Sequence, residues 1–512
     1  MAENDRKHKK YTSKEEDIDS LDKEQDNDES VRKDYPVKEE SEYDKSILIE
    51  PIEDKKETDK KTAKKKTNGS PIRSVLKKSM IGMEVEMFTL DENGNMANLA
   101  DVLIKEVKKK YPLVGTAKEA GRSTIEIKSF PNEAISDTME HLLEEMESVL
   151  ICAEKENIRL FPLGTFPGSF TPDMRQDTPY LLKEQIFGKN RFLIAGRCVG
   201  LHIHYTLPWG VFDSKQKILK RLHRSKNQQT MVGSYNLLIA MDPALTTFMQ
   251  SSPFYQGKYI GKDSRVIVYR GGSDFDYPQG LYANYYAFGA LQPYKQTNTD
   301  MIDVIFRKYD EWKNIIQKID MNLRVFSKHG SILDTTWNPV KVNAVGTLEQ
   351  RGMDTNHPMY MTAAGALIKY ILRYVEDENI NVIPSDIGVA EPFKLEGNVM
   401  YIPPHTHVRK NLQRNAAYDG LDNREVYDYC KILLKLASQC IPKDKEVLLD
   451  PFRKIIDEKK TVSDEIIELA KKKGADLKET LPKSIVTEIA LEHSGRLFKE
   501  IVLTKKMLHD LK

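Results

Sequence analysis

The sequence of 512 residues contains only four cysteines, and their spacing excludes the common cysteine-based sites. Cys152, Cys198, Cys430 and Cys440 form no CxxC pair and no zinc-finger spacing. Free thiols in a reducing compartment are the simplest interpretation of such scattered cysteines. We therefore expect a cytoplasmic protein without a disulfide framework.

The sequence has neither an excess of charge of one sign nor a long apolar run. The 78 basic and 77 acidic residues give a net charge of +1, so no bulk field favours nucleic acid or an anionic membrane. The N-terminal residues contain no apolar core of a signal peptide, and Asp242 and Pro243 interrupt the apolar run at 237–249. We expect a soluble protein that binds neither nucleic acid nor membrane. Its oligomeric state stays open.

The first 75 residues lack Phe and Trp and consist largely of charged side chains. Such a segment cannot bury enough apolar surface to offset the entropy lost on ordering. We predict a disordered, charged tail over 1–75. Its KKTAKKK run at 60–66 has the composition of a nucleic-acid contact or a localisation signal, but a solvated linker is the favoured interpretation.

From residue 76 the composition becomes globular, and strands alternate with helices. We predict a main domain over 76–421, with an irregular but structured wall at 258–300, and a helical extension over 422–512 packed on that domain. The expected helices lie at 99–111, 137–157, 214–224, 233–250, 299–318 and 362–376, with a last long one from about 483. Strands separated by helices indicate an α+β fold with an antiparallel or mixed sheet.

The stretch IGMEVEMFTL at 81–90 organises the candidate site. In a strand, alternate residues share a face, so Glu84 and Glu86 lie on one side and Met83, Val85 and Met87 on the other. Three later stretches, at 123–130, 198–207 and 346–353, repeat this alternation. If the four strands form one sheet, one face gathers these polar side chains: Glu84, Glu86, Thr124, Glu126, Lys128, His202, His204, Glu349 and Arg351.

Carboxylates gathered in this way favour a site for Mg²⁺ or Mn²⁺, which prefer oxygen ligands and share them with substrate phosphates. For Glu84 and Glu86 alone, two solvent-facing acids would be the better interpretation. The histidines of GLHIH also occur at zinc-site spacing. His202 fits a ligand, whereas His204 is equally a ligand neighbour or a hydrogen-bonded sheet residue. His405 and His407 form a second HxH, which we assign to a loop because no acids lie near it.

Arginines supply the candidate anion contacts. Arg351 lies next to the acid Glu349 in the pattern, and its guanidinium has the geometry to bind phosphate. The alternative interpretation is that the two residues form an ion pair at the surface. Arg265, in the Gly-containing loop predicted for GKDSRVIVYRGG, would hold a phosphate or a substrate carboxylate. The sequence has neither GxxxxGK[ST] nor GxGxxG, which disfavours P-loop and Rossmann nucleotide binding.

The motifs GMEVE, TIEIKSFP, GLHIH, SSPFYQGKYIGKDSR and GTLEQRGMD, in this order, resemble the second glutamate–cysteine ligase family, the ATP-dependent carboxylate–amine ligases. The resemblance runs over about 81–421 and implies a glutamine-synthetase-like fold, in which an antiparallel sheet forms a funnel. It implies metal positions at Glu84, Glu86, Glu126, His202 and Glu349. It also implies a nucleotide-phosphate contact at Arg351, and we add Arg265 and Lys128 as candidate cofactor contacts.

One family signature is only partly present. The run N-x-W-R-A-x-R-x-G-L is represented by KNLQRNAAYDGLD, in which Ala416, Gly420 and Leu421 match while the tryptophan and arginine positions differ. The part of the sequence expected to bind the substrate therefore departs from the family pattern more than the expected metal ligands do.

The resulting hypothesis is ATP-dependent joining of glutamate to an amine such as cysteine, the chemistry of glutathione biosynthesis, through an acyl phosphate. Arg351 and Glu349 are the candidate catalytic residues, ATP with Mg²⁺ or Mn²⁺ the cofactors, and the loops at 165–180 and 255–280 candidate lids. Two alternatives stay open. A metal-dependent hydrolase could use the same carboxylates and histidines without ATP, and a non-catalytic protein could bind ATP without turnover.

Overall fold

The computed structural model describes residues 79–221, 225–319 and 331–511. The predicted tail at 1–75 lies outside the described residues. Within the described ranges, no helix is both long and apolar enough to cross a membrane.

The centre of the fold is a seven-stranded antiparallel sheet with the order β10-β11-β5-β1-β3-β2, in which β4 also pairs with β1. This confirms the predicted α+β class with an antiparallel sheet. The strands are β1 (Ile81–Leu90), β2 (Thr116–Lys118), β3 (Thr124–Lys128), β4 (Arg159–Phe161), β5 (Gly200–Thr206), β10 (Val340–Asn343) and β11 (Thr347–Asp354).

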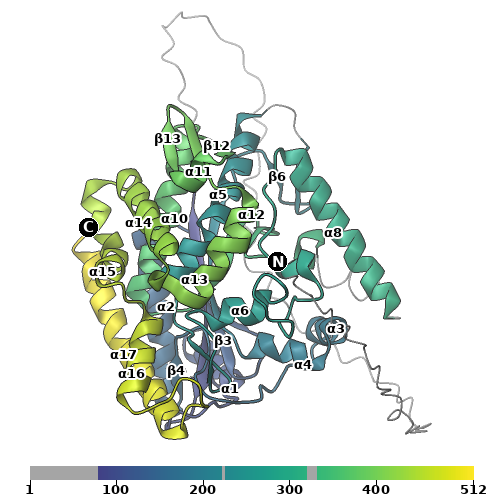
Figure 1. Cartoon of the computed structure of the whole chain (residues 1–512). Helices are drawn as coiled ribbons and strands as arrows, with labels where there is room; N and C mark the ends of the chain where they lie inside the picture. The colour runs from purple at the N-terminus through teal and green to yellow at the C-terminus, as the bar shows by residue number, and fades with distance from the viewer. Residues whose placement is uncertain (1–78, 222–224, 320–330, 512) are drawn as a thin grey trace, which may run out of the picture. The chain divides into compact units, whose positions relative to one another are not determined.

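One face of this sheet is apolar and covered by helices. Met83, Val85, Ile127, Leu201 and Ile203 on that face are at most 1 % exposed. Helices α2 (Ile135–Lys155), α5 (Lys226–Phe248) and α10 (Pro358–Asp377) pack against the strands. Figure 1 shows α2, α5 and α10 grouped around the sheet. Burial of one face leaves the other face, with its charged side chains, free to form a site.

Most predicted helices are present with shifted ends. Besides α2, α5 and α10, the chain forms α1 (Ala100–Lys110) and α8 (Asn298–Lys318) near the predicted positions. Helix α5 begins at Lys226, seven residues before the predicted start at 233, and continues through Pro243. The Thr246 hydroxyl donates a hydrogen bond to the Asp242 carbonyl, and the Thr247 hydroxyl donates one to the Pro243 carbonyl.

The helix predicted at 214–224 is wrong over its described part. Residues 212–219 instead form a hairpin of β6 (Phe212–Asp213) and β7 (Ile218–Leu219). The Asp213 carboxylate accepts hydrogen bonds from the backbone amides of Lys215 and Gln216, and Lys217 has a φ of 53°. An aspartate that binds the backbone of the next residues favours a turn over a helix.

The wall predicted at 258–300 contains regular structure. Its elements are β9 (Lys258–Tyr259), which pairs with β8 (Phe254–Tyr255) just before the wall, then α6 (Ser264–Arg270) and α7 (Tyr286–Gly289). Arg265 therefore lies on a helix and not on the predicted loop. That helix is capped by Asp263, whose carboxylate accepts a hydrogen bond from the Val266 amide at 2.8 Å.

The structure also contains short elements that the sequence pattern did not predict. A three-stranded sheet has the order β12-β14-β13. His405 and His407 lie in a short helix and not in the predicted loop, and His407 pairs with Glu425 at 2.8 Å. The short elements are α3 (Thr178–Phe187), α4 (Lys189–Phe192), β12 (Asn381–Pro384), α11 (Ile387–Ala390), β13 (Lys394–Glu396), β14 (Val399–Ile402), α12 (His405–His407) and α13 (Gln413–Asp419).

The C-terminal part is helical, as predicted. It contains α14 (Arg424–Cys440), α15 (Asp450–Glu458), α16 (Val462–Lys472) and α17 (Lys483–His509). Helix α17 packs against α2, α10 and β4, and Figure 1 shows it in yellow beside α16. The described residues belong to a single compact unit. The domain boundary at 421 stays a prediction.

Candidate active site

The strand register places the predicted acids and histidines on one face of the sheet. Glu86 lies opposite Glu126 across β1 and β3, and Glu84 lies opposite Lys128 on one side and His202 on the other. His204 lies opposite Glu349. Residues opposite each other in antiparallel strands share a face. The two-residue alternation in four separate stretches thus becomes one continuous polar surface.

His202 lies among three carboxylates, of which only Glu84 is within reach of a long hydrogen bond. Its Nδ1 is 3.4 Å from Glu84 Oε2 and 3.9 Å from Glu349 Oε1, and its Nε2 is 3.7 Å from Glu86 Oε1. Hydrogen bonds of this type are about 2.7–3.2 Å long. The imidazole is therefore surrounded by acids without being tightly bound to any of them.

Two groups of ligand atoms have the spacing of metal sites. Glu84, Glu126 and His202 form one group, and Glu86, Glu119 and Glu126 form the other, with all atoms of a group within 4.8 Å of one another. An ion with bonds of about 2.1 Å joins ligand atoms up to about 4.2 Å apart, so any pair of atoms near the 4.8 Å limit would have to move closer to share one ion. Oxygen donors with one imidazole suit Mg²⁺ or Mn²⁺. The residues present thus fit the divalent ions expected from the sequence.

Glu119 was missed by the sequence prediction. It follows β2 directly, and β2 pairs with β3 so that Ala117 lies opposite Glu126. Continuing the two-residue alternation from Ala117 places Glu119 on the side of Glu126. The three-residue strand β2 is too short to recognise from its pattern, which is why this acid was not found.

Lys128 lies among the acids. Its ammonium is 2.7 Å from Glu126 Oε1 and 3.1 Å from Glu84 Oε1. Burial opposes charge on Lys128, but the two carboxylates raise its pKa above the ordinary value. Its contact with a nucleotide stays a prediction.

A β-bulge sets the direction of Arg351. Between Gln350 and Met353 the register of β11 against β5 shifts by one residue. The Arg351 guanidinium lies 3.3 Å from Glu349 Oε1, and its side chain is 23 % exposed. The predicted pairing of Glu349 with Arg351 is therefore present, with Arg351 exposed at the polar face.

Arg265 lies beneath this bulge. Its guanidinium donates hydrogen bonds to the carbonyls of Gly352 at 3.1 Å and Arg351 at 3.3 Å, and the residue is 6 % exposed. A Cβ on Gly200 would lie 2.2 Å from Arg265 Nη2, so the approach of Arg265 requires glycine there. Arg265 thus supports the backbone that carries Arg351, and its contact with a phosphate or carboxylate stays a prediction.

A pocket of about 580 Å³, partly open to solvent, adjoins the polar face. Glu86, Glu119 and Arg351 line one part, and the aromatic side chains of Tyr180, Phe187, Tyr269, Tyr282 and Trp337 line much of the rest. Lys183, from α3, also lines it, with Nζ 4.8 Å from the centre of the Trp337 ring. Sequence reasoning missed Lys183 because α3 has no strong apolar periodicity that would orient it.

The acids on this face differ in their tendency to hold a proton. Burial and the charge of Glu84 raise the pKa of Glu126 to about 8, and burial and the charge of Glu86 raise that of Glu119 to about 7. Burial acts in the same direction on Glu84 and Glu349. However, His204 lowers the pKa of Glu84 and Arg351 lowers that of Glu349, so both are below their ordinary values. The site therefore holds both protonated and ionised carboxyl groups near neutral pH.

His204 has one bound and one unbound ring nitrogen. Its Nδ1 lies 2.9 Å from Thr347 Oγ1, while Nε2 is buried and makes no hydrogen bond. Burial lowers the pKa of His204, but Glu84, 3.6 Å away, raises it above the ordinary value. An unbonded buried nitrogen that faces a carboxylate is consistent with either predicted role, ligand neighbour or sheet residue.

Strand β10, also missed from the sequence, adds two side chains next to Glu349. The Asn343 amide donates a hydrogen bond to Glu349 Oε2 at 2.6 Å, and Lys341 lies opposite Glu349 in the register. The amide holds Glu349 in place at the end of the polar face. A four-residue edge strand gave too little pattern for prediction.

Comparison with solved structures identifies relatives of this fold. The crystal structure of a glutamate–cysteine ligase from Francisella tularensis in complex with AMP superposes with a TM-score of 0.50 at 13 % identity, covering 85 % of this chain and 97 % of that one. A bifunctional glutathione synthetase from Pasteurella multocida gives a TM-score of 0.49 at 14 % identity, covering 82 % of this chain. This chain spans 53 % of that longer protein. At 13 % identity, the likeness to the Francisella tularensis structure shows the fold alone, which is glutamine-synthetase-like.

Sequence comparisons give the family. A curated protein of Corynebacterium jeikeium (strain K411), named "Putative glutamate--cysteine ligase 2", is 21 % identical over 347 residues, which are 67 % of this chain and 72 % of that protein. The model of glutamate–cysteine ligase family 2 matches residues 80–480. The match contains every residue predicted for the site, from Glu84 to Arg351, and covers most of the chain. The chain therefore belongs to glutamate–cysteine ligase family 2, a family of carboxylate–amine ligases.

Proposed function

We propose that this protein joins a carboxylate to an amine at the expense of ATP, with glutamate as the acid and cysteine as the first amine to test. A carboxylate is a poor electrophile, so its oxygen first attacks the γ-phosphate of ATP, giving an acyl phosphate and ADP. The amine then attacks the acyl carbon, and the C–O bond to phosphate breaks. The products are an amide, ADP and phosphate, with the amine proton released.

The observation that carries this proposal is the register of the sheet. Five predicted ligands, together with Glu119 and Arg351, lie on one face beside a pocket lined by Lys183 and aromatic side chains. Ligation with ATP requires a place where a polyphosphate, cations and an acid meet. Membership of a ligase family supports this use of the face over hydrolysis.

Glu84, Glu86, Glu119, Glu126, His202 and Glu349 would hold the divalent ions. Mg²⁺ or Mn²⁺ bound there supplies charge neutralisation on the phosphate oxygens. The chain itself adds Arg351, whose guanidinium reaches the face from the bulge and stabilises the charge that develops on the transferred phosphoryl group. A preorganised contact of this kind contributes about 3 kcal/mol to transition-state stabilisation.

The pocket gives the acyl phosphate a protected place. Tyr180, Tyr282 and Trp337 line the pocket, and their aromatic rings would limit the access of water. Lys183 offers a cation to the carboxylate of an amino-acid substrate. Tyr180 and Lys183 come from α3, and Tyr269 comes from α6, so the two predicted lid segments each contribute to the wall.

The test is release of ADP by the purified protein with ATP and Mg²⁺. Glutamate is supplied first, and amines are then added singly, cysteine before others. An increase that needs both glutamate and cysteine supports the full proposal. Turnover with another acid–amine pair keeps the ligase chemistry and rejects these substrates. Hydrolysis of an amide substrate without ATP would support the hydrolase, and ATP binding without turnover under any pair would support a non-catalytic protein.

The Glu84→Gln variant connects that activity to the polar face. It keeps the size of the side chain but removes the charge, so we expect turnover to fall by about a hundredfold or more. Glu154→Gln, on the exposed surface of α2, is the matched control and should keep full activity. Unchanged turnover in Glu84→Gln would reject the metal role of this acid.

A further inference from the structure

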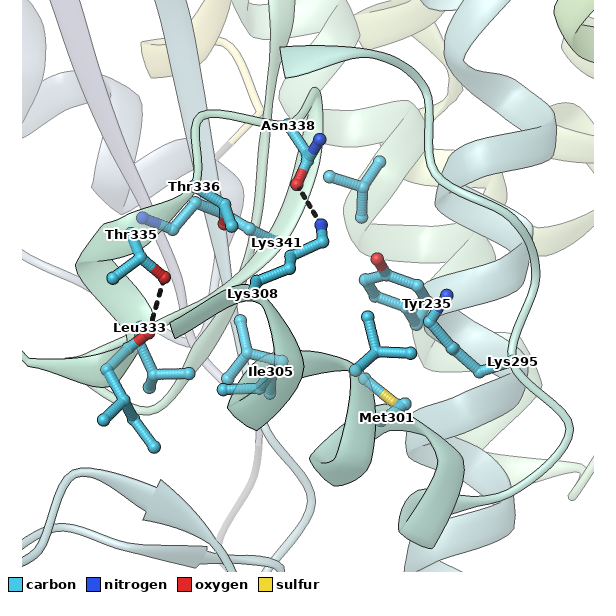
Figure 2. Close-up of a pocket in the computed structure, with 14 residues that line it drawn as sticks. Tyr235, Lys295, Met301, Ile305, Lys308, Leu333, Thr335, Thr336, Asn338 and Lys341 are labelled. Carbon is cyan, nitrogen blue, oxygen red and sulfur yellow. Dashed lines mark hydrogen bonds between the residues drawn. The ribbon is translucent and has the colours of Figure 1, made fainter. Parts of the chain in front are cut away.

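A second pocket lies at the edge of the sheet, beyond β10. Its walls come from α5, α8 and β10 and from the segment that leads into β10. Apolar side chains, among them Met301, Ile305, Leu333 and Val340, form much of the lining, and Tyr235 contributes its ring. Figure 2 shows Lys308 reaching across the middle of this pocket, with Lys341 and Lys295 on either side.

The three lysines are buried, and no acid lines the pocket beside them. Lys295, Lys308 and Lys341 are 6 %, 8 % and 8 % exposed, and the residues that line the pocket include no Asp or Glu. None of the three has a carboxylate ion-pair partner among the described residues. Lysines are rarely this buried unless they are paired, and an unpaired buried ammonium is costly.

Lys308, the central lysine, uses only part of its hydrogen-bonding capacity. Lys308 Nζ donates to Asn338 Oδ1 at 2.6 Å, as the dashed line in Figure 2 shows. The Asn338 amide group is fixed in this orientation because it donates to the carbonyls of Ala287 and Ala290. An ammonium has three donors, so the single acceptor leaves donors for another group in the pocket.

We propose that this pocket binds an organic carboxylate, whose anionic end contacts Lys308 and whose apolar body lies against Met301, Ile305 and Leu333. The ammonium supplies the charge that selects an anion, and the lining selects an apolar body over a small hydrated ion. Burial lowers the pKa of all three lysines, although Asp300, Glu311 and Glu349 act in the opposite direction on Lys295, Lys308 and Lys341. The proposal does not depend on the ligase reaction.

The first experiment measures binding with a matched pair of probes, hexanoate and 1-hexanol, by calorimetry on the full chain without ATP. Hexanoate should bind at least about tenfold more tightly than hexanol, since only hexanoate carries the charge. Equal binding of both, or binding of neither, would overturn the proposal. Inorganic phosphate is the third probe; phosphate binding without hexanoate binding would also overturn it, because it would show a site for a small anion only.

The variant Lys308→Met tests whether this lysine is the anchor. Methionine has similar length and no charge, so the free variant should be at least as stable as the wild type, while hexanoate binding falls by at least about tenfold. Lys313→Met is the matched control, because Lys313 lies on the same helix and pairs with Asp310 at the surface. It should keep hexanoate binding. Unchanged binding in Lys308→Met would reject the site.

A measurement on the wild type covers the case in which Lys308→Met does not fold. Reductive methylation, followed by mass spectrometry, reports how accessible each lysine is. Hexanoate should slow methylation of Lys308 relative to hexanol and leave that of Lys313 unchanged. Equal methylation of Lys308 with both probes would contradict its contact with a carboxylate.

Discussion

At the scale of single residues, Gly200 controls the approach of one arginine to the candidate site. The absence of a Cβ lets Arg265 reach the carbonyls that form the bulge of β11. We predict that Gly200→Ala destabilises the protein by about 1–3 kcal/mol, because the added methyl group overlaps a buried guanidinium. It should also lower turnover by at least about tenfold, since Arg351 would shift with the bulge. Urea unfolding and ADP release measure the two effects.

The control for Gly200→Ala is Gly495→Ala. Gly495 lies inside α17, and a Cβ there would meet no atom within 4 Å. This substitution should leave turnover unchanged and stabilise the helix by about 0.5–1 kcal/mol. If Gly200→Ala behaves like Gly495→Ala, Arg265 does not constrain the bulge.

The raised pKa values of two acids predict how stability depends on pH without divalent ions. Glu126 and Glu119 have ordinary values of 4.5, which the fold raises to about 8 and about 7. At pH values between the ordinary pKa and the raised pKa, the folded chain holds protons on these acids that the unfolded chain has released. The stability that this protonation contributes is therefore lost as pH rises from about 4.5 to about 8.

Divalent ions should reverse this loss. Ligands must be deprotonated to bind a metal, so Mg²⁺ should stabilise the protein more at about pH 8 than at about pH 6. Urea unfolding at both pH values, with Mg²⁺ and with EDTA, measures the difference. The same gain at both pH values would show that these acids do not bind the ion.

At the scale of elements, a buried histidine pair joins the C-terminal helix to the domain. His493 on α17 and His357, just before α10, lie with Nδ1 and Nε2 3.0 Å apart, and both are at most 2 % exposed. Burial, followed by the charge of Arg496, lowers the pKa of His493 from 6.5 to about 3, and burial and His493 lower that of His357. Both rings are therefore neutral in the folded protein.

This pair predicts a loss of stability in acid. The unfolded chain takes up protons on both imidazoles near pH 6.5, while the folded chain does not. The stability from this pair is thus complete above about pH 6.5 and falls steadily as pH decreases toward about 3. His493→Gln keeps a hydrogen-bonding group that does not titrate, so its unfolding free energy should fall less between about pH 7 and about pH 5. An equal fall in wild type and variant would contradict this account.

Elements with a long or repeated pattern were predictable from the sequence, and short ones were not. The ten residues of β1 alternate without interruption, and the register confirmed which of its side chains share a face. By contrast, β2 and β10 have three and four residues, too few to show an alternation. They contribute Glu119, Lys341 and Asn343. The pocket walls from α3 and α6 depend on tertiary contacts, which no local pattern encodes.

At the scale of the molecule, the C-terminal helices and the segment that leads to Arg265 hold each other in place. The Ser463 amide donates to the Gln250 carbonyl at 3.1 Å, and its hydroxyl donates to the Lys262 carbonyl at 2.6 Å. Lys262 also pairs with Asp464. Residues 250–264 thus connect α16 to the helix that carries Arg265.

We predict that removing residues 461–512, which deletes α16 and α17, prevents cooperative folding of the catalytic region. Ile489, Leu497 and Ile501 on α17 are fully buried, so the deletion would expose their apolar partners on α2, α10 and β4. Each such residue contributes about 1.5–3 kcal/mol by burial, and a typical domain is stable by only about 5–15 kcal/mol. The truncated chain should unfold without a sharp transition in circular dichroism and should lack ADP release. A truncated chain that unfolds cooperatively and releases ADP would show instead that these helices are a separable extension, and that the region ending before 461 forms the whole catalytic unit.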